Sequence, residues 1–284
     1  MDKVDQFESL FRSATKPAFE REEVPIASVL VAADGSDEEA EAYGDRVRSF
    51  LDTLGANVHW RDVGSDGFPT INALHEILEA EQPDLICTHR HLASASRRWQ
   101  STLGEYLDVL TQTTDTPVLV LPHPGAEDVP DFAQRDTSMV MALTNHLPGD
   151  GRLVNTALRL TRPQGTLALC HIEDDLVFER YMEVISRIPD VDTDLARETI
   201  HAQLEKEPRD WITSVKQALD TAGVHVRVQE LVVFGHHLKT CLHHVKEQEA
   251  GLVVIHTKDE DQSAMHGLAY PLAIDLRDTP LLMA

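Results

Sequence analysis

The sequence has little cysteine, few aromatic residues, little positive charge and no long apolar run. Its three cysteines, Cys87, Cys170 and Cys241, stand far apart among 284 residues. Their odd number and wide spacing favour free thiols over a disulfide framework. No apolar stretch approaches the roughly 20 residues that span a bilayer, and the first residues lack the basic start and apolar centre of a secretory signal. We therefore expect a cytoplasmic protein without membrane insertion.

Positive charge is scarce relative to negative charge. Lys and Arg total 25 against 48 Asp and Glu, so the formal net charge is −23. Such a surface repels nucleic acid and anionic membranes, and it disfavours polyphosphates unless a local basic site offsets it. We predict no nucleic-acid partner, and we interpret most of the charge as a solvated surface that keeps the protein soluble.

The motifs of several enzyme classes are missing as well. The sequence contains no Gly-x-Ser-x-Gly nucleophile elbow and no Gly-x4-Gly-Lys-Ser/Thr phosphate loop. His237, Cys241 and His244 share one face of an expected helix, which is a plausible metal geometry. However, no carboxylate completes a His-Glu-x-x-His motif there. The sequence therefore predicts no catalytic residue and no metal site.

What the chain does contain is a stretch that occurs twice, at residues 85–122 and 252–283. Each copy has an apolar run, a histidine, a glycine that starts a helical pattern, the triplet Asp-Thr-Pro and a final apolar run. The glycines, Gly104 and Gly267, each stand 13 residues before the proline. Strand, helix and strand in this order predict a right-handed parallel β-α-β crossover.

The repeat predicts two similar α/β domains, each a doubly wound parallel sheet covered on both faces. We expect an N-terminal arm at residues 1–24, a first domain at 25–123, a linker at 124–136 and a second domain at 137–284. The first domain is shorter, and we expect it to lack one strand and one helix that the second retains.

A mostly helical region is expected between the second and third strands of the second domain. It spans residues 175–222 and contains Pro189 and Pro208. Proline lacks a backbone N–H and clashes with the preceding turn of a helix. We therefore predict an interruption near each of these prolines.

The order and spacing of these elements resemble those of a tandem universal stress protein. Val31-Ala32-Ala33-Asp34-Gly35-Ser36 resembles the end of that family's first strand, and Gly104 followed by residues 117–121 resembles its last loop glycine and final strand. The resemblance covers residues 26–122 and 137–283. It implies a flavodoxin-like fold, also described as adenine-nucleotide alpha-hydrolase-like, in each domain. It also implies a stress-linked regulatory or interaction role without enzymatic activity.

In nucleotide-binding members of that family, an aspartate meets the adenine or ribose and a glycine loop wraps the phosphates. Asp34 matches that aspartate and Gly104 the third glycine, whereas the first two glycines have no counterpart. Glu105 stands where the family has Ser or Thr, and its carboxylate would repel a phosphate. The second domain departs further, with residues 256–261 in place of the glycines, so we expect no nucleotide there.

The loop that replaces the glycines in the first domain is nevertheless rich in arginine. Arginine forks bind phosphate in a bidentate manner, so the first domain is a candidate site for ATP, AMP or another anion, and a weak ATPase is a further alternative. Pairing of these arginines with nearby carboxylates is the non-functional interpretation. The predicted site residues are Asp34, Gly35, Ser36, Thr88, Arg90, Arg97, Arg98 and Gly104.

The resemblance also bears on how the two domains associate. Single-domain relatives form homodimers, and an edge strand is an open template for hydrogen bonding. We therefore predict that the final strands, at residues 118–121 and 281–283, pair to make an internal pseudo-dimer. A homodimer of the whole chain and a separate protein partner are left open.

Overall fold

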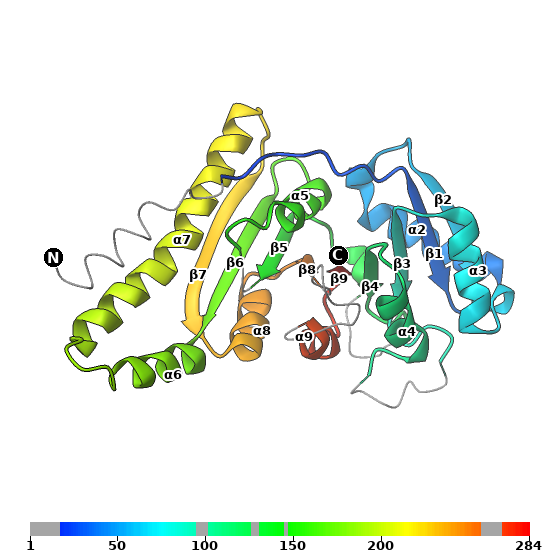
Figure 1. Ribbon diagram of the computed structural model, residues 1–284. Helices are drawn as coiled ribbons and strands as arrows, with labels where there is room; N and C mark the ends of the chain where they lie inside the picture. The colour runs from blue at the N-terminus through cyan, green and yellow to red at the C-terminus, as the bar shows by residue number, and fades with distance from the viewer. Residues whose placement is uncertain (1–17, 95–101, 126–130, 145–146, 257–268) are drawn as a thin grey trace.

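A single nine-stranded sheet forms the centre of the molecule (Figure 1). The computed structural model describes residues 18–94, 102–125, 131–144, 147–256 and 269–284. The strand order is β2-β1-β3-β4-β9-β8-β5-β6-β7. All neighbours are parallel except β4 and β9. The strands are β1 (Ser28–Ala33), β2 (His59–Gly64), β3 (Leu85–His89), β4 (Val118–Leu121), β5 (Met139–Thr144), β6 (Thr166–Asp174), β7 (Arg227–Gly235), β8 (Leu252–Ile255) and β9 (Leu281–Met283).

Helices cover both faces of this sheet (Figure 1). Helices α2, α5 and α7 bury their apolar sides in one core, and α3, α4, α8 and α9 bury theirs in the other. Because the inner strands are buried on both faces, β1, β4, β5, β8 and β9 are mainly continuous apolar runs rather than alternating ones. The edge strands β2 and β7 are partly exposed and carry charged residues. The helices are α2 (Asp37–Phe50), α3 (Ile71–Glu81), α4 (Glu105–Thr113), α5 (Gly151–Leu160), α6 (Asp175–Ile185), α7 (Thr193–Thr221), α8 (His237–Glu247) and α9 (Ala269–Asp275).

The predicted seam between the final strands is confirmed. Strands β4 and β9 pair antiparallel, with Val118 opposite Met283 and Val120 opposite Leu281. Both strands are fully buried, and each of the two apolar cores continues across them. The two expected sheets are therefore joined into one by backbone hydrogen bonds and by shared burial.

The two halves of the sheet differ in size as expected. The half from β2 to β4 has four strands, whereas the half from β9 to β7 has five. In the larger half, α6 and α7 lead from β6 to an additional edge strand, β7. In the smaller half, β2 occupies the position beside β1 that β6 occupies beside β5.

The predicted break at Pro208 is wrong. Helix α7 continues through this residue over 29 residues. On the C-terminal side of Pro208, Trp211, Ile212 and Val215 are buried against the sheet. Tertiary packing of these side chains outweighs the loss of one hydrogen bond at the proline. The interruption near Pro189 is present, because the chain has no helix between α6 and α7.

The expected linker is partly packed rather than loose. Its described part contains a short 3-10 helix, η3 (Phe132–Gln134). The ring of Phe132 is 1% exposed and lies 5.6 Å from the Tyr43 ring and 6.2 Å from the Phe50 ring, both on α2. Among the described helices, none is long and apolar enough to cross a membrane.

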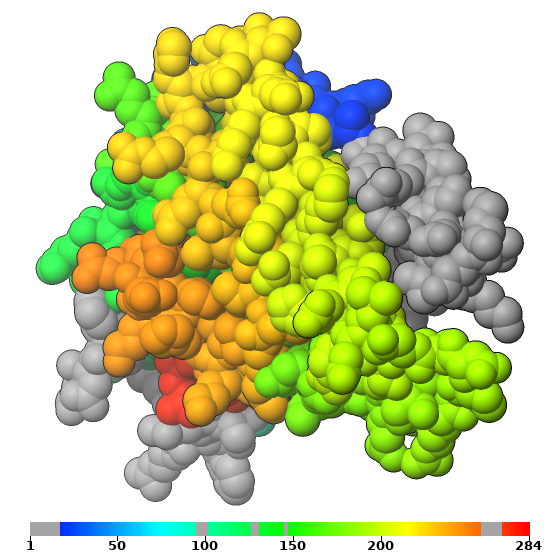
Figure 2. Space-filling model, turned by 90° about the vertical axis from the view of Figure 1, so that its left-hand side faces the viewer, coloured from blue at the N-terminus to red at the C-terminus, as the bar shows by residue number. Residues whose placement is uncertain are grey.

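Exposed apolar side chains gather on one projection of the larger half. Figure 2 shows this projection in yellow-green, formed by α6 and the start of α7. It has its own small core around Phe178 and Met182. The exposed large apolar residues among those described are Leu176, Val177, Tyr181, Val184, Ile188 and Leu195.

Candidate functional site

A cavity of about 390 Å³ lies at the carboxyl ends of β1, β2 and β3. Parallel α/β sheets bind ligands at this edge, because the loops that follow the strands converge there. Its walls come from the turn after β1, the loop after β2, the loop after β3 and the first turn of α4. The lining residues are Asp34, Ser65, Phe68, Pro69, Ala93, Ser94 and Tyr106.

Asp34 is held at the cavity wall by the two loops beside it. Its Oδ1 accepts the N–H of Ala93 at 2.7 Å, and its own N–H donates to Nε2 of His89 at 3.4 Å. The next residue, Gly35, has a φ of +86° and donates its N–H to Oγ of Ser65 at 2.9 Å. The side chain of Asp34 is 26% exposed, so its carboxylate is both fixed and accessible from the cavity.

The residues after Asp34 start a helix and play no part in the cavity wall. Ser36 caps α2: its Oγ accepts the N–H of Glu39, and its own N–H donates to the Glu39 carboxylate at 2.8 Å. These two hydrogen bonds form a capping box, which satisfies backbone N–H groups at the start of the helix. Gly35 and Ser36 therefore shape the turn that presents Asp34 rather than contacting the cavity themselves.

Two aromatic rings form the apolar part of the cavity wall. Phe68 follows a short 3-10 helix after β2, and Tyr106 lies in the first turn of α4. Their ring centroids are 6.0 Å apart. Phe68 is fully buried behind the surface of the cavity, and Tyr106 is half-buried. The cavity thus combines one carboxylate with aromatic surface.

Gly104 starts α4 as predicted and has a clear steric reason to be glycine. It is the N-cap residue of α4 and has a φ of +103°. A Cβ at this position would stand 2.8 Å from Cα of His91. The close approach of α4 to the loop after β3 therefore depends on the missing side chain.

Arg90 lies in a different place from the one that an anion site requires. Its guanidinium donates to the carbonyl oxygens of Ala273 and Leu276, at the end of α9 in the other half of the sheet. The residue is 5% exposed, and burial, with nearby Arg277, lowers the pKa of Arg90 to about 10. Arg90 thus binds the negative end of a helix across the seam, and it does not line the cavity at Asp34.

The remaining predicted residues are not part of the cavity wall that the structure describes. Thr88 is fully buried within β3, and its hydroxyl has no hydrogen-bond partner among the described residues. Glu105 is exposed in the first turn of α4. Arg97 and Arg98 lie outside the described residues.

Two histidines close to Asp34 were not combined with it by sequence reasoning. His89 ends β3, and His123 follows β4 by two residues. Nε2 of His89 lies 3.8 Å from Oδ1 of Asp34, and Nε2 of His123 lies 4.0 Å from Oδ2. The two imidazole rings are 5.1 Å apart between centroids. The available signal was positional: each histidine stands at the carboxyl end of a buried strand, His89 on β3 beside β1, and His123 after β4 on the far side of β3.

The matching edge of the larger half holds a different pair. His256 occupies the position of His89 in the repeat, and its Nε2 lies 2.9 Å from Oδ1 of Asp150. Burial lowers the pKa of His256, but the hydrogen bond that His256 donates to Asp150 and the negative charge of Asp150 raise it more, so the net shift is upward. Asn145, at the place of Asp34, lies outside the described residues.

The histidine-rich helix α8 does not present the face that its spacing predicted. Cys241 is fully buried in the core, and burial raises the pKa of its thiol. Nε2 of His237 instead contacts the carbonyl oxygen of Ile172 at 2.7 Å. His243, His244 and Glu247 cluster at the surface near the end of the helix.

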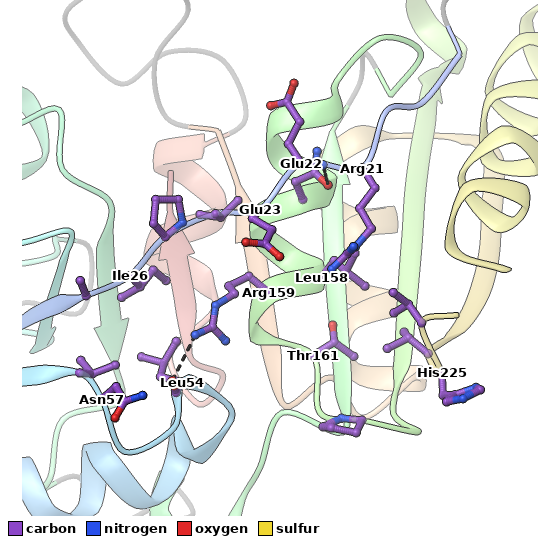
Figure 3. A pocket seen from close by; sticks show the side chains of 18 residues that line it. Arg21, Glu22, Glu23, Ile26, Leu54, Asn57, Leu158, Arg159, Thr161 and His225 are labelled. Atoms are coloured by element: carbon purple, nitrogen blue, oxygen red, sulfur yellow. Dashed lines mark hydrogen bonds between the residues drawn. The ribbon is translucent and has the colours of Figure 1, made fainter. Parts of the chain in front are cut away.

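A second and larger cavity, of about 940 Å³, lies between the two halves (Figure 3). Residues 21–27 cross over it before entering β1. The amide of Asn155 on α5 holds this segment, accepting the N–H of Glu22 and donating to the carbonyl of Glu20, both at 3.1 Å. Arg159 points from α5 to the carbonyl oxygens of Thr53 and Leu54, at 2.9 and 3.2 Å.

Comparisons with known proteins give a likeness of fold only. No family model matches the sequence, and no curated protein matches it. A functionally unknown protein from Pseudomonas aeruginosa is similar in structure, with 13% identity, a TM-score of 0.49 and 92% of each chain covered. A universal stress protein from Archaeoglobus fulgidus is also similar, with 13% identity and a TM-score of 0.45, covering 92% of this chain and 88% of that one. At these values neither likeness shows a function for this chain.

Proposed function

We propose that this chain is a non-enzymatic regulatory protein of the universal stress type that responds to a small ligand bound in the Asp34 cavity. The observation that carries the proposal is the cavity itself, which places one fixed carboxylate opposite aromatic surface at the ligand-binding edge of the sheet.

A nucleoside is the ligand class that suits these walls best. The half-buried ring of Tyr106, backed by the buried ring of Phe68, offers apolar surface for a planar base. The carboxylate of Asp34 accepts hydrogen bonds from ribose hydroxyls or from an exocyclic amino group. None of the described residues that line the cavity is basic. A phosphate group would therefore depend on Arg97 and Arg98.

Isothermal titration with adenosine, AMP, ATP and inorganic phosphate tests the proposal. We expect adenosine to bind and Asp34→Asn to weaken it by about 10- to 100-fold, because a hydrogen bond to a charged group contributes about 1.5–3 kcal/mol. Asparagine keeps the oxygen that accepts the Ala93 N–H, so the loop remains in place. Tyr106→Ala should also weaken adenosine binding, because it removes the ring at the cavity wall. Tyr181→Ala, which removes an exposed ring on α6, is its matched control and should leave binding unchanged.

Three outcomes would contradict parts of this proposal. Absence of heat with every ligand would remove the ligand-binding role. Equal affinity of the parent and Asp34→Asn would move the ligand to another site. Release of phosphate from ATP by the parent protein, lost in Arg97→Ala with Arg98→Ala, would make the protein an ATPase.

A further inference from the structure

Three potential metal ligands converge beside the cavity from three adjacent strands. Asp34 follows β1, His89 ends β3 and His123 follows β4. One ligand atom of each residue lies within 4.8 Å of the other two. The Nε2 atoms of His89 and His123 lie 3.8 Å and 4.0 Å from the carboxylate oxygens of Asp34. Tetrahedral Zn²⁺, with ligand atoms 2.0–2.1 Å from the ion, requires about 3.3 Å between those atoms. Small side-chain rotations are enough to close this gap.

The ring of His89 is already oriented as a metal ligand. Its Nδ1 lies 2.9 Å from the carbonyl oxygen of Arg90 and donates to it, so the lone pair of the neutral ring is on Nε2. That lone pair accepts the N–H of Asp34 in a long contact of 3.4 Å, which a metal ion would replace. A backbone carbonyl that fixes the far nitrogen in this way is the usual outer partner of a metal-bound histidine. The side chain is 1% exposed, so its orientation is set by the core.

His123 needs one change before it can bind a metal ion. Its Nδ1 accepts the N–H of Gly125 at 2.9 Å, so the neutral ring carries its proton on Nε2, towards Asp34. Binding through Nε2 moves that proton to Nδ1 and turns the Gly125 N–H away. Gly125 is exposed in a turn, where such a movement meets little packing.

We propose that Asp34, His89 and His123 form a binding site for a divalent transition-metal ion of the Zn²⁺ type. Two imidazoles and one carboxylate are the ligands that Zn²⁺ prefers, whereas Mg²⁺ and Ca²⁺ prefer oxygen alone. Because Asp34 also lines the cavity, the fourth coordination position opens towards it. The ion would thus enter through the cavity and present its open position to whatever ligand the cavity holds.

The proposal does not rest on nucleoside binding, and the metal alone is the probe. The metal-free protein, prepared with a chelator and then dialysed, is titrated with Zn²⁺ against a chromophoric competitor, and in parallel with Co²⁺. We expect one tight Zn²⁺ equivalent and a Co²⁺ absorption band typical of a four-coordinate nitrogen and oxygen site. His123→Gln is the main test variant, because His123 does not line the cavity. It should lose more than about 100-fold in affinity, since even an outer-shell substitution costs 10- to 100-fold.

The matched control is His243→Gln with His244→Gln, which removes the exposed histidine cluster on α8. This control should still bind one equivalent of Zn²⁺ tightly and should keep the Co²⁺ absorption band. Asp34→Asn should lose the tight equivalent as well, and its thermal unfolding without metal shows whether it is folded. If His123→Gln keeps the tight equivalent, or the α8 control loses it, the assignment to Asp34, His89 and His123 is wrong. If His123→Gln loses Zn²⁺ but still binds adenosine, the metal site stands separately from the ligand proposed for the cavity.

Discussion

The two halves of the sheet repeat one scaffold and equip it differently. In the smaller half, His89 at the end of β3 meets Asp34 and His123. In the larger half the matching residue, His256, is paired with Asp150 at the start of α5 and approaches the carbonyl oxygen of Ala284 at 3.4 Å. The repeated histidine is therefore a feature of the shared architecture. Its chemistry is decided by the loops that the neighbouring strands bring to it.

The halves also resemble each other in how they hold together. Each sends one arginine to carbonyl oxygens at a helix end in the other half: Arg90 to the end of α9, and Arg159 to the residues of a short 3-10 helix after α2. Cations are favoured at the carboxyl ends of helices. The two contacts differ in burial, since Arg90 is 5% exposed and Arg159 is only half-buried.

The largest expected effect comes from removing the buried arginine. Arg90→Met should lower the free energy of unfolding by about 2–4 kcal/mol, because it leaves two buried carbonyl oxygens at the end of α9 without their donor. Arg159→Met should cost only about 1 kcal/mol, since water can replace the guanidinium there. Urea unfolding of the two variants measures both values. Equal losses would show that burial does not separate the two contacts.

The next effect concerns the glycines that start helices. Gly104→Ala should destabilise the protein by about 1–3 kcal/mol, because it forces a side chain into a left-handed conformation against the backbone of His91. Gly151→Ala, at the first residue of α5, meets open space and should stabilise by about 0.4–1 kcal/mol. Thermal unfolding of the pair gives shifts of opposite sign, and a loss at both positions would contradict this reading of Gly151.

The smallest effect is the pH dependence that His256 contributes. Its pKa is raised in the folded protein, so its pairing with Asp150 stabilises fully below the unfolded value of about 6.5 and the contribution is lost as pH rises through the folded pKa. Asp150→Asn keeps the cap of α5, where Oδ1 accepts the N–H of Leu153, but removes the charge. The variant should therefore lose stability at pH 5.5 and little at pH 8, by no more than about 1 kcal/mol. An identical loss at both pH values would assign the effect to the cap.

Sequence reasoning was most successful where one local pattern suffices. The apolar runs before His89 and His256 form strands, and Gly104 starts a helix, as their local patterns predicted. The pairing seam was expected from the family resemblance, and the structure has it. It failed at Pro208, where a local rule was overruled by packing of α7 on the sheet. It also assigned Arg90 to an anion site. The sequence places this arginine beside the candidate loop but does not show the direction in which its side chain points.

The candidate site shows the same division. Asp34 could be found from the turn that ends the first strand, since its position follows from one element. The approach of His123 could not, because it depends on the parallel placement of β3 between β1 and β4, and on a turn after β4. Phe68 and Tyr106 come from two further elements that are far apart in the chain.

The sequence by itself determined the strands, the order of the elements, the duplication and the shortening of one half, because hydrophobic periodicity and turn residues act locally. The tertiary structure alone decided which polar side chains meet. Asp34, His89 and His123 are brought together by strand order, and Arg90 is drawn away by the end of a helix in the other half. Contacts of this kind join elements that no sequence spacing relates, so only the folded sheet reveals them.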